Sequence, residues 1–185
     1  MAVRHTQHRS LLSLLRGGGY ILYARHAEAT VGEDGMNFTF MDCTTQRNLS
    51  EAGRKQAAAY GAALRRLRIP LVAPVLASPF CRNRETAELA FGSGVVQVDP
   101  FWVEVYRLSR NVSQAEEADI LRSVQSRLEF PPPAGTNRVI VAHSFPEYAG
   151  LGAIPNMGTV VVKPLGRGKG YEVAGRVSLE ELSRY

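Results

Sequence analysis

Short apolar runs alternate along this chain with segments in which apolar residues recur every three or four positions. Such runs predict buried strands, and they occupy residues 20–24, 71–77, 95–98, 138–142, 159–163 and 171–177. Helical spacing predicts helices over residues 50–68, 82–91 and 113–130, and a short amphipathic helix between Ser10 and Gly17. Residues 31–48 are polar and irregular, which predicts a loop.

The alternation of strands and helices predicts an α/β fold around a mostly parallel sheet. The chain has 185 residues, of which 45% are hydrophobic and 21% charged. These values are typical of one globular domain with a single sizeable core. We therefore expect one domain over residues 1–185.

Charge, apolar run length and cysteine content limit the expected binding partners and the expected location. The net charge is +5, but the 22 basic residues are spread among acids without a basic run, which favours a small phosphorylated molecule over a nucleic acid. The apolar runs are far shorter than the roughly 20 residues that cross a bilayer, so we expect no membrane span. Cys43 and Cys81 do not suggest a disulfide framework and are interpreted as small buried or loop residues, which makes the cytoplasm the expected location.

Polar residues follow three predicted strands. Arg25 and His26 end the first, Arg82 follows the second beyond Ser78 and Pro79, and His143 ends the fourth. A lone histidine at a strand end is commonly a packing residue, and charged residues on a helix commonly face water. In α/β sheets, however, ligands bind beyond the carboxyl ends of strands, so these groups are expected to share one cleft.

Other catalytic motifs are absent. A cysteine phosphatase needs an arginine six positions after its nucleophile, but Leu49 and Ala87 stand at those positions after Cys43 and Cys81. The segment GRGKG lacks the earlier glycine and the following Ser or Thr of a phosphate-binding P-loop. No histidine spacing indicates zinc.

Four segments together resemble the histidine phosphatase superfamily, the phosphoglycerate mutase-like phosphatases of branch 1. They are RHAEA at 25–29, NLSEAGRKQA at 48–57, ASPFCRNRETA at 77–87 and VAHS at 141–144. The resemblance covers most of the chain and implies a three-layer α/β/α sandwich of the phosphoglycerate mutase-like type. It also implies a phosphatase that needs neither a metal nor a cofactor.

The resemblance implies roles for five residues. His26 is the nucleophile that forms a phosphohistidine, and Arg25, Arg82 and His143 bind the phosphoryl group. This fits the chemistry, because a neutral imidazole attacks phosphorus and guanidinium groups bind phosphate oxygens in pairs. Glu104 is the expected general acid, on a loop after the middle strand, and Asp42, Glu28 and Glu147 stay open as alternatives.

Two departures leave the function open. The family usually has glycine after each histidine, where this chain has Ala27 and Ser144. We expect a phosphomonoesterase acting on a small phosphorylated substrate. A phosphohistidine protein phosphatase and a catalytically silent phosphate-binding module are the alternatives, and the oligomeric state is not predicted.

Overall fold

A computed structural model describes residues 11–185, so Ser10 lies outside the described residues. Its centre is one six-stranded sheet with the strand order β3-β2-β4-β1-β5-β6. The strands are β1 (Ile21–Arg25), β2 (Val75–Ala77), β3 (Val96–Val98), β4 (Arg138–Ala142), β5 (Thr159–Pro164) and β6 (Tyr171–Val177).

The part of the sheet that carries the predicted site is parallel. β1 pairs with β4, β4 with β2, and β2 with β3, all in parallel, whereas β5 and β6 are antiparallel additions. Arg25 is the register partner of Ala142, so His26 and His143 leave neighbouring strands at the same level. The parallel pairing thus delivers both histidines to one edge of the sheet.

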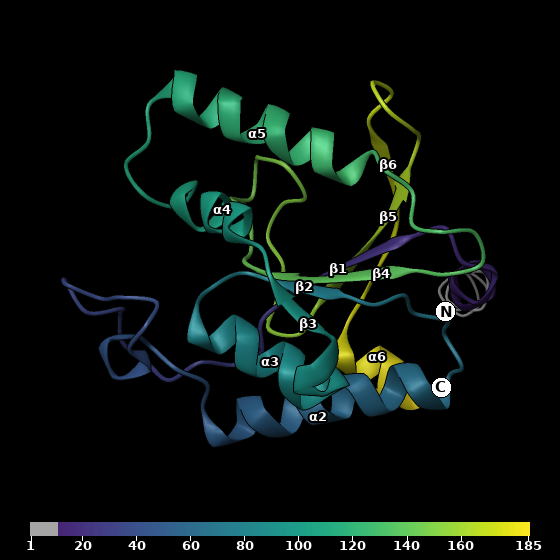
Figure 1. The fold of residues 1–185 in the computed structure, drawn as a ribbon, viewed down its shortest axis with the longest axis horizontal. Coiled ribbons are helices and arrows are strands. Elements are labelled where there is room, and N and C mark those ends of the chain that lie inside the picture. Colours follow the sequence, from purple (N-terminus) through teal and green to yellow (C-terminus); the bar gives the residue numbers. More distant parts are fainter. Residues whose placement is uncertain (1–10) are drawn as a thin grey trace.

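Helices cover both faces of the sheet and make the expected three layers (Figure 1). Buried apolar side chains form one cluster between the sheet and α2 with its neighbours, and a second cluster on the opposite face beneath α4 and α5. The α-helices are α2 (Glu51–Arg66), α3 (Cys81–Phe91), α4 (Val103–Arg107), α5 (Gln114–Leu128) and α6 (Leu179–Arg184), and residues 11–17 are also helical.

Local sequence explains where the elements begin. Ser50 accepts a hydrogen bond from the Gly53 amide and caps α2, and Ser113 forms a capping box with Glu116 at the start of α5. The predicted strand over 71–77 is shorter than expected and begins only at Val75, because Pro74 has no amide hydrogen to give to a neighbouring strand. Within residues 11–185, no helix has the length and apolar character needed to cross a membrane.

Candidate active site

Two histidines meet at the carboxyl ends of β1 and β4. The His26 and His143 rings lie with their centroids 5.8 Å apart and nearly perpendicular to each other. Both residues are buried, with exposed fractions of 3% and 4%. Burial of two imidazoles in contact disfavours the charged form of each, so the pair is held neutral.

A backbone contact sets the tautomer of His26. Its Nδ1 lies 2.7 Å from the carbonyl oxygen of Ala27. A carbonyl oxygen only accepts, so Nδ1 carries the proton and Nε2 keeps its lone pair. Burial, and then the charge of Arg82, lower the pKa of His26 to about 3. Its Nε2 is therefore unprotonated at neutral pH and keeps a lone pair.

His143 is fixed by the strand beside it. Its Nε2 lies 2.8 Å from the hydroxyl of Ser78, the residue that follows β2, and its carbonyl accepts a hydrogen bond from Tyr23. Burial, and then electrostatic repulsion from His26 and Arg82, holds the pKa of His143 well below its usual range. The residue after β2 thus orients the ring, and a side chain of β1 holds the backbone of His143.

Two arginines carry unused donors at this edge of the sheet. Arg25 gives one Nη1 hydrogen bond to the carbonyl of Ile154, and burial, then Arg47 and Arg82, lower its pKa. Arg82 is only 2% exposed. The Nε atoms of both arginines are buried without a hydrogen-bond partner among the described residues. Unpaired buried donors are costly, and an anion between these groups would satisfy them.

The loop over residues 31–48 closes over Arg82. Both Asp34 carboxylate oxygens accept hydrogen bonds from Arg82, at 2.8 Å from Nη1 and 3.2 Å from Nη2. Tyr106 of α4 donates to the same carboxylate. Burial by itself raises the pKa of Asp34, but hydrogen bonds from Arg82 and the Arg47 amide outweigh it, so the pKa lies below its usual value.

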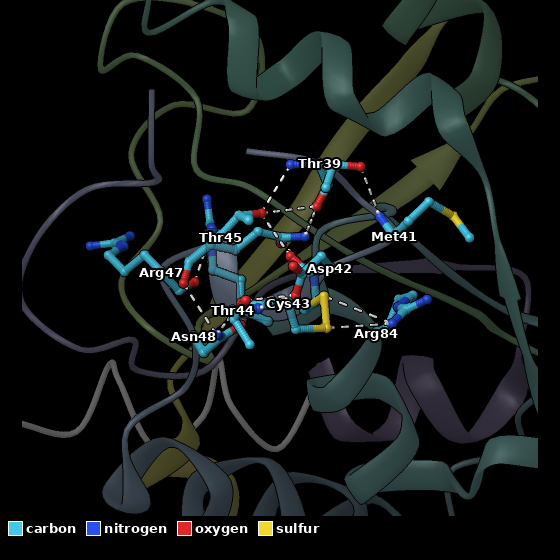
Figure 2. Close-up of a disulfide and its surroundings, with 12 residues drawn as sticks. Thr39, Met41, Asp42, Cys43, Thr44, Thr45, Arg47, Asn48 and Arg84 are labelled. Carbon is cyan, nitrogen blue, oxygen red and sulfur yellow. Dashed lines mark hydrogen bonds between the residues drawn. A yellow bond between two sulfur atoms is a disulfide. The ribbon is translucent and has the colours of Figure 1, made fainter. Parts of the chain in front are cut away.

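Cys81 is buried and Cys43 lies in the loop, as interpreted from the sequence, but the two residues form a disulfide that was not expected. Their Cα atoms lie 5.8 Å apart although 38 positions separate them in the chain. The bridge joins a 3-10 turn, η1 (Cys43–Thr45), to the first residue of α3, and Figure 2 shows it among the hydrogen bonds of the loop. The two cysteines come together because the loop folds back onto α3.

A family model decides the classification. The model described as histidine phosphatase superfamily (branch 1) matches residues 21–127, more than half of the chain. The chain belongs to this superfamily. A search of the curated proteins found no match.

Solved structures of other phosphatases share the fold of this histidine phosphatase. The protein histidine phosphatase SixA in complex with tungstate has a TM-score of 0.53 at 14% identity, and covers 88% of this chain and 99% of its own. A phosphoserine phosphatase from Entamoeba histolytica has a TM-score of 0.54 at 14% identity, covering 88% and 98%. The ecdysone phosphate phosphatase of Bombix mori, also with tungstate, has a TM-score of 0.50 at 15% identity, covering 84% and 91%.

The predicted general acid lies apart from the paired rings. Glu104 belongs to α4, so the expectation that it lies on a loop was wrong, and its carboxylate pairs with Arg107 at 2.7 Å. Among the alternatives, Glu28 accepts a hydrogen bond from the Ser50 hydroxyl, Asp42 caps η1, and Glu147 is exposed. None of these carboxylates contacts either histidine ring in the described part of the chain.

The two departures from the family pattern fit their positions. Ala27 is fully buried and its amide donates to Thr86, while the Ser144 hydroxyl accepts from the Ile154 amide. Among described residues other than glycine, only Arg68 and Met157 have positive φ. A side chain at positions 27 and 144 therefore meets no left-handed backbone, and the backbone does not require glycine there.

Asp34, Arg47 and Tyr106 belong to this site but were not predicted from the sequence. Each reaches Arg82 through the fold of a loop or a short helix, which leaves no periodic signal. In residues 11–185, no three His, Cys, Asp or Glu side chains gather as a metal-binding cluster.

Proposed function

We propose that this histidine phosphatase is a metal-independent phosphomonoesterase with His26 as its nucleophile. The observation that carries the proposal is the hydrogen bond from His26 Nδ1 to the Ala27 carbonyl, which leaves Nε2 free to attack. Arg25, Arg82 and His143 are the phosphate-binding residues. The buried, unpartnered Nε atoms of both arginines support this assignment.

The reaction has two displacements. The Nε2 lone pair of His26 attacks phosphorus, the P–O bond to the leaving group breaks, and its electron pair leaves on the alkoxide oxygen. Water then attacks the phosphohistidine, the P–N bond breaks, and its electron pair returns to Nε2. Guanidinium donors on the equatorial oxygens stabilise both transition states.

Protonation of the leaving oxygen decides the substrate class. Glu104 is the sequence-based candidate for this acid, and its pairing with Arg107 lends it no support. Asp34 is the carboxylate beside Arg82, and its lowered pKa makes it a poor proton donor. A substrate with a good leaving group needs no acid, which favours aryl phosphates over alkyl phosphates.

The lack of a supported general acid also favours a second candidate, a phosphohistidine protein phosphatase. Its leaving group is an imidazole, which departs from phosphorus more readily than an alkoxide. Hydrolysis of phosphorylated imidazole, phenyl phosphate and a simple alkyl phosphate should be compared side by side. Activity confined to the first would favour the protein phosphatase, whereas efficient alkyl phosphate hydrolysis would require an acid that this reasoning overlooks.

The location proposed for the protein changes with the disulfide. The cytoplasm was expected because the cysteines suggested no bridge, and the bridge removes that premise. Disulfides persist in oxidising compartments and are rare in the cytosol, so we favour an oxidising compartment. Alkylation of free thiols in whole cells, followed by mass analysis, tests this directly.

Hydrolysis of an aryl phosphate in excess chelator tests the function. Wild type, His26→Ala and His8→Ala are compared, the last because we assign His8 no role. We expect chelator-resistant turnover in wild type and His8→Ala, and none in His26→Ala. Turnover in His26→Ala would refute the nucleophile, while orthophosphate binding without wild-type turnover would support the silent binding module.

A further inference from the structure

The backbone of Arg47 is built into the contacts of Arg82. The Arg47 amide donates to Asp34 at 3.0 Å, and the Arg47 carbonyl accepts from Arg82 Nη1 at 3.1 Å. Asp34 and Arg82 are themselves an ion pair whose side chains are 5% and 2% exposed. Position 47 is therefore held against the phosphate-binding arginine by buried, charge-assisted hydrogen bonds.

The side chain of Arg47 has no polar partner within residues 11–185. Its guanidinium makes no hydrogen bond or ion pair to another residue within 11–185. Burial is the main cause of the lowered pKa of Arg25, His26, Arg82 and His143, which are four of the five predicted site residues, and the charge of Arg47 lowers each of these pKa values further. The backbone bonds of Arg47 hold this third arginine beside Arg82, and no carboxylate within residues 11–185 pairs with its guanidinium.

The positive charges of Arg25, Arg47 and Arg82 repel one another, so other contacts must hold these residues at one site. Asp34 offsets one of the three arginines, and the remaining repulsion favours movement of the loop away from α3. The disulfide opposes that movement at short range. Cys81 directly precedes Arg82, and Cys43 lies four positions before Arg47, so the bridge links the two arginine-bearing segments directly.

Besides the disulfide and the bonds of Arg82, further contacts join the loop to the start of α3. The side chain of Gln46 accepts a hydrogen bond from the Cys81 amide at 2.9 Å, and the Phe38 and Phe40 rings pack on Phe80. These contacts keep part of the loop in place when the bridge is open. The disulfide therefore tunes the position of Arg47 and is not the sole anchor of the loop.

We propose that Arg47 is a further anion-binding residue of this site and that the Cys43–Cys81 disulfide holds it there. Reduction of the bridge by a phosphine or a dithiol adds two electrons and two protons, giving two thiols while the reductant is oxidised. Arg47 then loses its fixed position, and affinity for the phosphoryl group falls. This inference rests on the proposed function only in that the bound anion is a phosphoryl group.

Orthophosphate binding, measured by calorimetry, tests the proposal in a double-mutant cycle. The cycle consists of oxidised wild type, Arg47→Ala, Cys43→Ser/Cys81→Ser, and the triple variant that combines them. Arg122→Ala is the charge-matched control, because Arg122 pairs with Asp119 on the exposed face of α5. Wild type with and without phosphine gives the same comparison in a chain with no substitution.

We expect Arg47→Ala to weaken orthophosphate binding about tenfold or more, as for loss of a charged hydrogen bond. The serine variant and reduced wild type should lose a similar factor, and the triple variant should lose little more, because both changes remove one interaction. Phosphine should leave the serine variant unchanged.

Two results would overturn the proposal. One is an Arg47→Ala variant that binds orthophosphate like Arg122→Ala, and the other is independent losses that multiply in the triple variant. If the serine variant does not fold, reduced wild type against reduced Arg47→Ala decides the same question. Because binding needs no turnover, a chain that shows this coupling but hydrolyses nothing would refute the proposed function and leave this inference standing.

Discussion

Substitution of Gly53 should disable His26, the proposed nucleophile, from a distance. Gly53 lies in α2, and a Cβ at this position would stand 2.0 Å from the carbonyl oxygen of Glu28 and 2.9 Å from its carbonyl carbon. Real Cβ contacts essentially never fall below 3.0 Å, so Gly53→Ala must move the Glu28 backbone by about 1 Å. Glu28 follows Ala27, whose carbonyl fixes the His26 tautomer.

Two magnitudes follow. Overpacking costs about 1–3 kcal/mol, and the better helix propensity of alanine offsets about 1 kcal/mol of it. The net loss of stability is thus on the order of 1 kcal/mol. A displacement of about 1 Å at a reacting group lowers a rate by about 10²-fold, so kcat should fall by that factor in protein that is still folded.

Gly61 provides the matched control. It lies in the same helix, and a Cβ there would stand 1.9 Å from the carbonyl oxygen of Ala90 at the far end of α3. Gly61→Ala should lower the melting temperature as Gly53→Ala does, without the loss of kcat. Aryl phosphate hydrolysis, corrected for the folded fraction, tests both. Equal kcat in the two variants would refute the link from Gly53 to His26.

Three further predictions concern pH, redox state and hydrogen bonding. Both histidines have depressed pKa values, and that of His26 is about 3 against an ordinary 6.5. Below about pH 6.5, the free energy of unfolding should therefore fall by up to about 1.4 kcal/mol per pH unit for each histidine. Denaturant titrations between about pH 7 and pH 5 should show half this pH dependence in His26→Asn, and an unchanged pH dependence would contradict the buried neutral pair. Reduction of the disulfide should lower the unfolding free energy by about 4 kcal/mol, from the chain entropy of a closed loop whose ends are 38 positions apart; urea midpoints that stay equal with and without phosphine would contradict it. Ser78→Ala should lower kcat about tenfold, because the His143 ring loses the hydrogen bond that orients it. The control Ser126→Ala on α5 should keep the kcat of wild type. Equal kcat in the two variants would show that Ser78 does not position the ring.

The sequence predicted the features of the fold that depend on short-range patterns of apolar and capping residues. Strand ends at Arg25 and Ala142 follow from apolar runs, and helix starts at Ser50 and Ser113 follow from capping chemistry. Because parallel strands align their carboxyl ends, the meeting of His26 and His143 could also be predicted. These features need only local periodicity and one topological rule.

Contacts that depend on the path of an irregular loop could not be predicted. The disulfide joins residues 38 positions apart, and the Asp34–Arg82 ion pair spans 48. Each requires the loop to fold back over α3, which no hydropathy pattern encodes. The helix α6 was also missed, although Ser178 and Glu181 form a capping box at its start. That signal is present in the sequence and too short to stand out.

Trapping of the covalent intermediate tests the central claim most directly. Wild type and His26→Ala should be mixed with an aryl phosphate in excess chelator, quenched with alkali within one turnover, and digested for mass spectrometry. The account predicts a phosphoryl group on His26 that is stable in alkali and lost in acid, and none in the variant. A phosphoryl group on another residue, or full turnover without any labelled histidine, would contradict it.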